Sequence, residues 1–339
     1  MNLFENKEYF QELIRRTSLH FGINISLIEK DFYIVFLLKK AFRNINGLVF
    51  KGGTSLSKCQ KTINRFSEDI DLTLVLEHSS QTFKRNSLRQ LIELCDENPF
   101  KLINKDTRLV HTHANYNCFN IDYPVIYQSK FISMNIKMEM VYLSKCYPSE
   151  KSTVCSYIGE YLISQNNNEL LKEYDLEPFQ VKVQSLNRTL VDKVFAICDY
   201  FLRNEVKRNS RHIYDIDHLL TKVELDDDLK VLIKQVRDER KKTKGCVSAQ
   251  DGVSINKILA QIIETNFYKE DYENVTSQLL FKDYKYEDAI KSLFKIIKSN
   301  VFEENSNLKR IGVAKKELEG FDLDLDEFNS IKTEDFNKK

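Results

Sequence analysis

Two segments near the N-terminus repeat apolar residues at the spacing of an α-helix. From Tyr9 to Ile14, and again from Leu27 to Phe42, apolar residues recur every three or four positions without an interrupting glycine or proline. This is the helical period. The second segment is apolar over most of its circumference, and such helices are normally buried. We therefore expect it to lie against a sheet.

The first strands of that sheet are expected directly after these helices. Residues 48–50 form a short apolar run that ends at Gly52-Gly53, which is typical of a buried strand entering a tight turn. A short helix is expected from Ser55 to Lys61. Residues 69–76 then alternate polar and apolar side chains before becoming apolar, which predicts a second strand.

Further along, the pattern predicts more elements of both kinds. Helix is expected around Leu88–Cys95, and a strand from Ser133 to Tyr142, where polar and apolar residues alternate. Helices mixed with strands in this way indicate an α/β (α+β) domain with a mixed sheet.

A polar stretch after Pro148 marks the expected end of this domain. From Arg188 to Val206 apolar residues return at helical spacing, and mostly helical segments continue to about Lys298. The last stretch, Gly320–Lys339, alternates acidic and apolar residues and ends polar. We expect a bilobal chain, with an α/β domain at residues 1–175 and an α-helical domain with an acidic tail at residues 176–339.

Composition narrows the class of protein without identifying its chemistry. Of 339 residues, 42% are apolar and 30% charged, the balance of a globular protein with a real core. The 51 basic and 50 acidic side chains nearly cancel, so any nucleic-acid contact must be local. Seven scattered cysteines suggest neither a disulfide framework nor a zinc site. No signal peptide or membrane span is indicated, and we expect a cytoplasmic protein.

The chemistry is expected at Asp69 and Asp71. Residues two apart on a strand point to the same face, and two neighbouring carboxylates attract a divalent cation that relieves their repulsion. Oxygen ligands of this kind suit Mg²⁺ or Mn²⁺. Taken alone, an Asp-x-Asp pair on an exposed strand is more often structural.

A glycine turn precedes these carboxylates. Gly52, Gly53, Thr54 and Ser55 follow the first expected strand, and the free backbone amides and small hydroxyls of such a turn can receive phosphate oxygens. Glycine permits the close approach that this needs. The spacing is not that of a P-loop. An ordinary turn with Thr54 or Ser55 as helix cap is the alternative.

Together the two segments resemble the DNA polymerase β-like nucleotidyltransferase superfamily. More narrowly, they are similar to the AbiEii-type toxin family of bacterial type IV toxin-antitoxin and abortive-infection systems. The segments that carry the resemblance are KGGTSLSK at Lys51–Lys58 and RFSEDIDL at Arg65–Leu72, with RTLVDK at Arg188–Lys193 and RHIYDI at Arg211–Ile216 in the helical half.

The resemblance implies roles for particular residues. Ser67, Asp69 and Asp71 match the segment that binds metal and nucleoside triphosphate, and the Gly52-Gly53 turn with Ser55 lies beside the phosphates. In the helical half, Lys193 matches a lysine that meets the triphosphate, and Asp215 matches an aspartate important for activity. Without the resemblance, Lys193 would be interpreted as a surface lysine and Asp215 as a partner of Arg211.

Other candidates depend on weaker patterns. Glu139 is the best-placed third carboxylate for the metal, although an ordinary solvent-facing strand residue is equally compatible with its pattern. His111 and His113 can share a strand face, but lack an evident third ligand, so a surface pair is favoured. A group of basic residues could contact a polyanion such as tRNA: Lys207, Arg208, Arg211, Arg237, Arg240, Lys241, Lys242 and Lys244. A solvated helix face is the usual alternative.

The resulting expectation is a metal-dependent nucleotidyltransferase toxin. The resemblance implies transfer of a nucleoside monophosphate from a nucleoside triphosphate to RNA, with the tRNA 3′ end as the preferred acceptor. It also implies a cognate, AbiEi-like antitoxin protein. Two alternatives keep the same fold: a nucleotidyltransferase acting on a protein or small molecule, and a non-catalytic interaction protein. Intact Ser67, Asp69, Asp71 and Lys193 argue against the second.

Overall fold

The chain forms two compact units. The structure, a computed structural model, describes residues 2–75, 81–107, 110, 116–130, 132–143 and 148–303. The first unit runs to Ser185 and also includes Leu279–Lys282, and the second comprises Leu186–Gln278 and the chain from Asp283 onward. Each unit is described by itself below.

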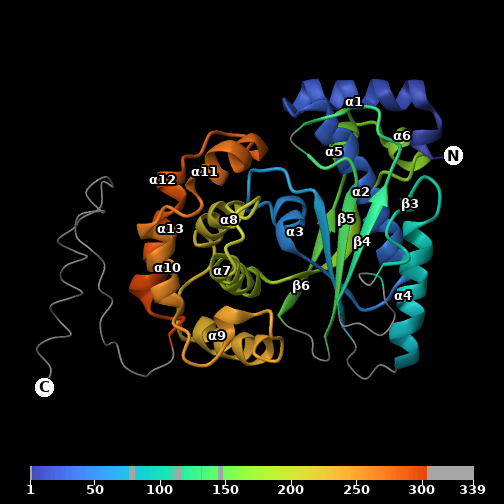
Figure 1. Cartoon of the computed structure of the whole chain (residues 1–339). Helices are drawn as coiled ribbons and strands as arrows, with labels where there is room; N and C mark the ends of the chain where they lie inside the picture. Colours follow the sequence, from blue (N-terminus) through green and yellow to red (C-terminus); the bar gives the residue numbers. More distant parts are fainter. Residues whose placement is uncertain are drawn as a thin grey trace, which may run out of the picture. The chain divides into compact units, whose positions relative to one another are not determined.

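A seven-stranded mixed sheet forms the centre of the first unit (Figure 1). Its strand order is β3-β4-β5-β2-β1-β7-β6. β2 pairs in parallel with β5, as β1 does with β7, and the other pairings are antiparallel. The expected mixed sheet is therefore confirmed. The strands are β1 (Leu48–Lys51), β2 (Asp69–Val75), β3 (Lys101–Leu102), β4 (Tyr116–Asp122), β5 (Ile136–Leu143), β6 (Ser149–Val154) and β7 (Phe179–Gln184).

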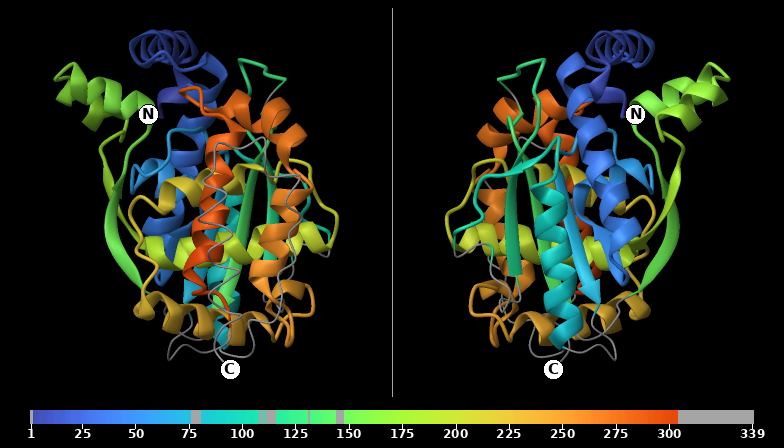
Figure 2. Two further views of the ribbon diagram at one scale, coloured as in Figure 1. Left: turned by 90° about the vertical axis from the view of Figure 1, so that its left-hand side faces the viewer. Right: turned by 90° about the vertical axis from the view of Figure 1, so that its right-hand side faces the viewer.

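Helices of the first unit pack around this sheet. Figure 2 (right) shows α2 and α4 lying across one face of it. α2 contacts β2, α4 and α5, which confirms that the second N-terminal helix lies against a sheet. The helices are a 3₁₀ turn at Leu3–Glu5, α1 (Lys7–Phe21), α2 (Ile25–Asn44), α3 (Gly52–Lys58), α4 (Gln81–Cys95), α5 (Tyr157–Ser164) and α6 (Asn168–Glu173).

The alternating sequence of β2 decides which of its faces is buried. Ile70, Leu72 and Leu74 are fully buried in the core that β2 shares with α2. Asp69 and Asp71, at the intervening positions, are only partly buried. Because successive strand residues face opposite sides of a sheet, burying the leucines places both aspartates together on the other face.

Several elements differ from the sequence-based expectation. The helix expected at 55–61 begins at Gly52 and ends at Lys58. The polar stretch after Pro148 contains β6, α5 and α6, which were not predicted. A division at residue 175 would separate β7 from β1 and β6, with which it pairs, and the contacts place the division after Ser185. Short half-exposed elements give weak apolar periodicity, which is why the pattern did not indicate them.

The described part of the second unit consists of helices and turns. α7 contacts α8, α9 and α10, and α13 contacts α8 and α10. The helices are α7 (Leu186–Leu202), α8 (Arg211–Leu219), α9 (Asp227–Arg240), α10 (Ile255–Glu264), α11 (Lys269–Asp271), α12 (Tyr286–Ala289) and α13 (Lys291–Ser299), with a π-helical turn at Tyr272–Thr276 and 3₁₀ turns at Val247–Ala249 and Ser277–Leu279.

Some predicted features lie outside the described residues. These are His111, His113 and the acidic stretch from Gly320 to Lys339.

The cysteines of the described part are free thiols. Among the described residues, no helix combines the length and apolarity that crossing a membrane requires.

Replacing Leu72 by alanine should destabilise the first unit by about 2–5 kcal/mol, because it leaves a cavity on the fully buried face of β2. Chemical denaturation monitored by circular dichroism measures the change. Leu19→Ala is the matched control, since Leu19 is 85% exposed and its loss should change stability by less than about 0.5 kcal/mol. Equal effects of the two substitutions would contradict the assignment of the core.

Candidate active site

The pairing of β1 with β2 brings the glycine turn to the carboxylates. In the antiparallel register, Lys51 is opposite Asp71, and residues directly opposite each other place their side chains on the same face. Gly52 follows Lys51 and begins α3. The turn and the carboxylate strand, nearly twenty residues apart along the chain, therefore meet at one edge of this pair.

Gly52 has room for no side chain. Its φ of +76° lies in the left-handed region, which favours glycine. A Cβ on this residue would lie 1.9 Å from Oδ2 of Asp71, so the carboxylate occupies the space that a side chain would need. Gly53 is similarly restricted, because its Cβ would lie 2.7 Å from both Nη2 of Arg65 and Oγ of Ser67. The two glycines thus allow three polar side chains to reach the turn.

The hydroxyls of the turn are used within the protein. Thr54 Oγ1 donates to the carbonyl of Asp69, and Ser55 Oγ donates to the carbonyl of Gly52 at 2.9 Å. Both side chains are buried. Neither caps α3, whose N-cap is Lys51 with no side-chain hydrogen bond. Thr54 thus holds the turn on the carboxylate strand, and Ser55 closes the turn on itself. Contact of either hydroxyl with phosphate stays a prediction.

β5 adds one lysine and one glutamate side chain to the same face of the sheet. In the parallel register, Asp69 is beside Lys137 and Asp71 is beside Glu139. Lys137 and Glu139 form an ion pair. Partial burial lowers the pKa of Lys137, but Glu139, with a weaker contribution from Asp69, more than offsets this and holds that pKa above its ordinary value. Lys137 therefore stays charged beside the carboxylates.

The donor set suits a divalent cation that its substrate helps to bind. Mg²⁺ is usually held by one or two carboxylates, with waters and substrate phosphates as its other ligands. Asp69 and Asp71 provide two carboxylates on one face. No cluster of three or more His, Cys, Asp or Glu side chains able to hold a metal occurs among the described residues. Glu139 as a third ligand stays a prediction.

A distant segment supports the loop before β2. Leu279–Lys282, here called the return segment, pairs through its backbone with Asn64–Phe66: Phe66 N donates to the Leu279 carbonyl at 2.8 Å, and Phe281 N donates to the Asn64 carbonyl at 3.0 Å. Arg65, in the middle of this loop, is 1% exposed and donates to the carbonyl of Phe66 at 2.9 Å. The loop that leads to Ser67 and Asp69 is therefore fixed by backbone pairing.

Lys193 and Asp215 form a buried ion pair in the second unit. Lys193 on α7 donates to Asp215 Oδ2 on α8 at 2.5 Å, with side-chain exposures of 7% and 0%. Lys193 is thus not the surface lysine of the alternative interpretation, and Asp215 has a partner on another helix. The structure brings these two predicted residues together.

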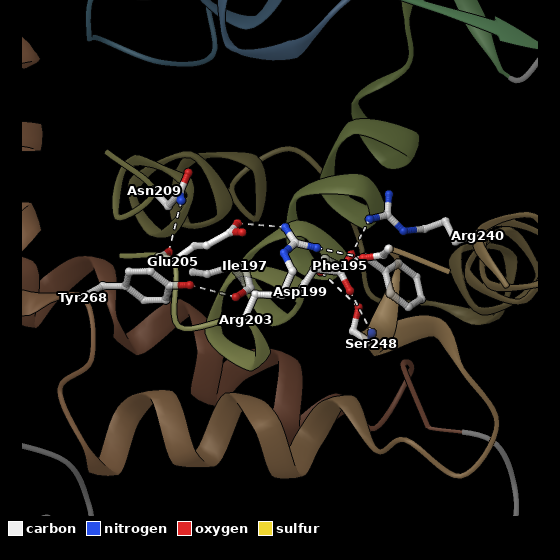
Figure 3. Close-up of polar contacts among 10 residues, drawn as sticks. Phe195, Ile197, Asp199, Arg203, Glu205, Asn209, Arg240, Ser248 and Tyr268 are labelled. Carbon is white, nitrogen blue, oxygen red and sulfur yellow. Dashed lines mark hydrogen bonds and ion pairs between the residues drawn. The ribbon is translucent and has the colours of Figure 1, made fainter. Parts of the chain in front are cut away.

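Polar contacts fix the part of α7 that follows Lys193 (Figure 3). Asp199 accepts hydrogen bonds from Arg240 Nη2 at 2.8 Å and from the Ser248 amide at 2.7 Å. Tyr268 donates to the carbonyl of Ile197 at 2.9 Å. These bonds come from three separate segments and hold the turns of α7 that follow Lys193.

The expected basic surface is only partly present. Arg237 is buried and donates to the carbonyls of Val253 and Phe302, and Arg240 is bonded to Asp199 as above. Lys241 forms an ion pair with Asp251 at 2.6 Å. Lys242 and Lys244 are exposed. Sequence spacing could not separate these cases, because only packing decides which cations of a helix face its neighbours.

Two residues without a predicted role belong to the site. Arg65 begins the segment Arg65–Leu72 that carries part of the family resemblance, but only the structure shows that its side chain is buried beside Gly53. Lys137 belongs to the alternating polar set of the strand expected at 133–142, so its face was predictable. Its pairing partner required the sheet register.

Comparison with known proteins finds a family whose model matches most of the chain. The family model described as "Nucleotidyl transferase AbiEii toxin, Type IV TA system" matches residues 39–305. No curated protein matches the chain. A solved structure, JHP933 from Helicobacter pylori, is similar over 90% of this chain and 98% of its own, with 15% sequence identity and a TM-score of 0.40. That likeness is too weak to support a conclusion.

Replacing Gly52 by alanine should displace the Asp71 carboxylate and destabilise the first unit by more than backbone strain alone. Gly22→Ala is the control, since Gly22 also has a positive φ but nothing within 4 Å of its Cβ; it should cost about 1–2 kcal/mol. Chemical denaturation of both variants measures the difference. Equal losses would show that Asp71 does not restrict residue 52.

Replacing Lys193 by methionine should destabilise the second unit by about 3–5 kcal/mol, because Asp215 would keep a buried charge without this partner. Lys269→Met is the matched control: Lys269 pairs with Glu287 at 2.7 Å, but both side chains are about two-fifths exposed, so its loss should cost no more than about 1 kcal/mol. Thermal or chemical denaturation compares the two. A small effect at Lys193 would argue against a buried, charged pair.

Proposed function

The chain belongs to the family of nucleotidyl transferase AbiEii toxins of the type IV toxin-antitoxin system, and on this basis we propose that it transfers a nucleoside monophosphate to RNA. The preferred acceptor is the 3′ end of tRNA. The observation that supports a catalytic rather than a binding role is the contact of the Asp71 carboxylate with the Gly52 turn. A carboxylate beside this turn suits a metal-bound triphosphate, because Mg²⁺ is usually held by one or two carboxylates together with substrate phosphates.

In the proposed reaction, a hydroxyl oxygen of the acceptor attacks the α-phosphorus of a nucleoside triphosphate. A new P–O bond forms, the bond to the β-phosphate oxygen breaks, pyrophosphate leaves, and the hydroxyl proton passes to water. Asp69 and Asp71 would hold Mg²⁺ or Mn²⁺, which when bound neutralises charge on the phosphate oxygens. The amides of Gly52 and Gly53, with Ser55 and Ser67, would orient the triphosphate.

We assign Lys193 and Asp215 to the same reaction. Lys193 would provide a point charge for the triphosphate, and Asp215 would hold the lysine side chain in place, as its buried contact at 2.5 Å allows.

The biological setting follows from this activity. A tRNA whose 3′ end has been extended cannot be aminoacylated, so translation and growth would stop. We propose that the protein acts in the cytoplasm as a defence against phage infection, and that an AbiEi-like antitoxin counteracts it.

The reaction is tested with purified protein, Mg²⁺, each labelled nucleoside triphosphate in turn, and total bacterial tRNA. Label should enter tRNA with the intact protein, and Asp69→Ala should reduce the rate by about a hundredfold or more. Asp96→Ala is the matched control, because Asp96 lies in the same unit and pairs with Lys105 away from the site; it should retain the rate. Label that enters a protein instead of tRNA would show that RNA is not the acceptor. The absence of label from every fraction would contradict nucleotidyl transfer.

Metal dependence is a separate prediction. Chelation by EDTA should abolish label transfer, and added Mg²⁺ or Mn²⁺ should restore it, because two carboxylates would leave water and substrate phosphates to complete the ligands of a bound cation. Isothermal titration should then detect Mg²⁺ binding mainly in the presence of nucleotide. Full activity after exhaustive chelation would contradict a role for Asp69 and Asp71 as metal ligands.

A further inference from the structure

Three consecutive charged residues are buried in the middle of α2. Glu29, Lys30 and Asp31 are each at most 1% exposed, in a helix whose buried side chains are mostly apolar. Isolated charges are rarely buried, because their desolvation costs several kcal/mol each. A run of three in one helical turn therefore requires an explanation beyond packing.

Each of the three binds a different segment. Successive residues of a helix point about 100° apart, so one turn can reach several neighbours. Glu29 accepts the amides of Ile126 and Tyr127 at 2.7 and 2.9 Å. Lys30 pairs with Glu68 and Asp31 pairs with Lys58, and both partners lie in segments of the candidate active site.

Lys30 holds the start of the carboxylate strand. Its Nζ donates to Glu68 Oε2 at 2.7 Å and to the carbonyl of Ser133 at 2.9 Å. The same Glu68 oxygen accepts the Ser133 amide at 2.9 Å. Glu68 directly precedes Asp69, and Ser133 lies just before β5, which carries Lys137 and Glu139. One ammonium group therefore joins the entries of β2 and β5.

Asp31 holds the helix of the glycine turn. Its Oδ1 lies 2.5 Å from Nζ of Lys58, the last residue of α3. Its Oδ2 accepts the amide of Tyr157 at 2.7 Å, and the Lys58 ammonium lies over the Tyr157 ring, 3.3 Å from its centroid. α3 begins with Gly52, so this pair fixes the far end of the element that forms the phosphate-binding turn.

From these contacts we propose that Lys30 and Asp31 are positioning residues for nucleotidyl transfer, with Lys30 acting through Glu68 on the carboxylates and Asp31 acting through Lys58 on the glycine turn. The inference deepens the proposed function and rests on it. A buried ion pair adds little net stability over apolar side chains of the same size, whereas its short directional bonds fix geometry. The two neighbouring residues thus set the separation between metal ligands and phosphate site.

Kinetics distinguish this role from general stabilisation. Lys30→Gln should lower kcat for label transfer roughly 10- to 100-fold with little change in KM for the nucleotide, because small displacements of reacting groups have effects of this size. Asp31→Asn, which keeps an acceptor for the Tyr157 amide, should instead raise the nucleotide KM. Lys30→Arg and Asp31→Glu, which keep the charge, should recover part of each loss.

The matched control is Lys39→Gln. Lys39 is also a buried lysine of α2, bonded to Asp175 at 2.8 Å and to the carbonyls of Asp175 and Glu177, none of which belongs to the site. It should lower stability without changing kcat or KM. If all three neutral variants change activity in proportion to their loss of thermal stability, the positioning role is overturned.

Hydrogen exchange of the full chain tests the same role without substrate. Lys30→Gln should speed amide exchange in residues 66–75, and Asp31→Asn in residues 52–58, with unchanged exchange in α7. If the intact protein transfers no label, the proposed function fails, and exchange alone judges the positioning role. Faster amide exchange throughout the first unit, without a local effect, would overturn the positioning role. Should a neutral variant not fold, Lys30→Arg and Asp31→Glu give the same local readout.

Discussion

The carboxylate of Asp71 lies where a side chain on Gly52 would have to be, and the arrangement of the first unit depends on this contact. It requires β1 and β2 to pair in one register, because a slip of a single residue would turn both aspartates into the core and the leucines out of it. The same register lets Thr54 bond to the backbone of Asp69. A tight turn, a buried apolar face and a two-carboxylate face are thus consequences of one strand pairing.

Charge in the interior serves this geometry rather than the stability of the fold. The core of α2 and the sheet is largely apolar, yet α2 interrupts it with three charged residues whose partners lie in several different segments. Apolar packing tolerates small rearrangements, but a buried ion pair does not, since either partner left alone is costly. Apolar contacts therefore hold the unit together, and the ion pairs specify where the segments of the site lie.

The second unit uses the same principle with other residues. Lys193 and Asp215 are buried and paired, and Asp199 anchors the following turns of α7 to Arg240 and Ser248. Arg237 and Arg240, which in the sequence look like part of a basic surface, serve here as internal donors. Lys242 and Lys244 are the members of the basic run at residues 237–244 that are exposed.

The sequence by itself determined the elements with strong periodicity: the two N-terminal helices, the strands carrying Leu48–Phe50 and Asp69–Asp71, the mixed sheet, and the shared face of the two aspartates. Local patterns suffice there because one buried face sets both the element and its orientation. Only the tertiary structure decided the strand pairing, the burial of Arg65, Arg237 and Lys193, and the partners of Glu29, Lys30 and Asp31. Those features depend on contacts between residues far apart in the chain, and no local spacing encodes which distant carboxylate a buried lysine will meet.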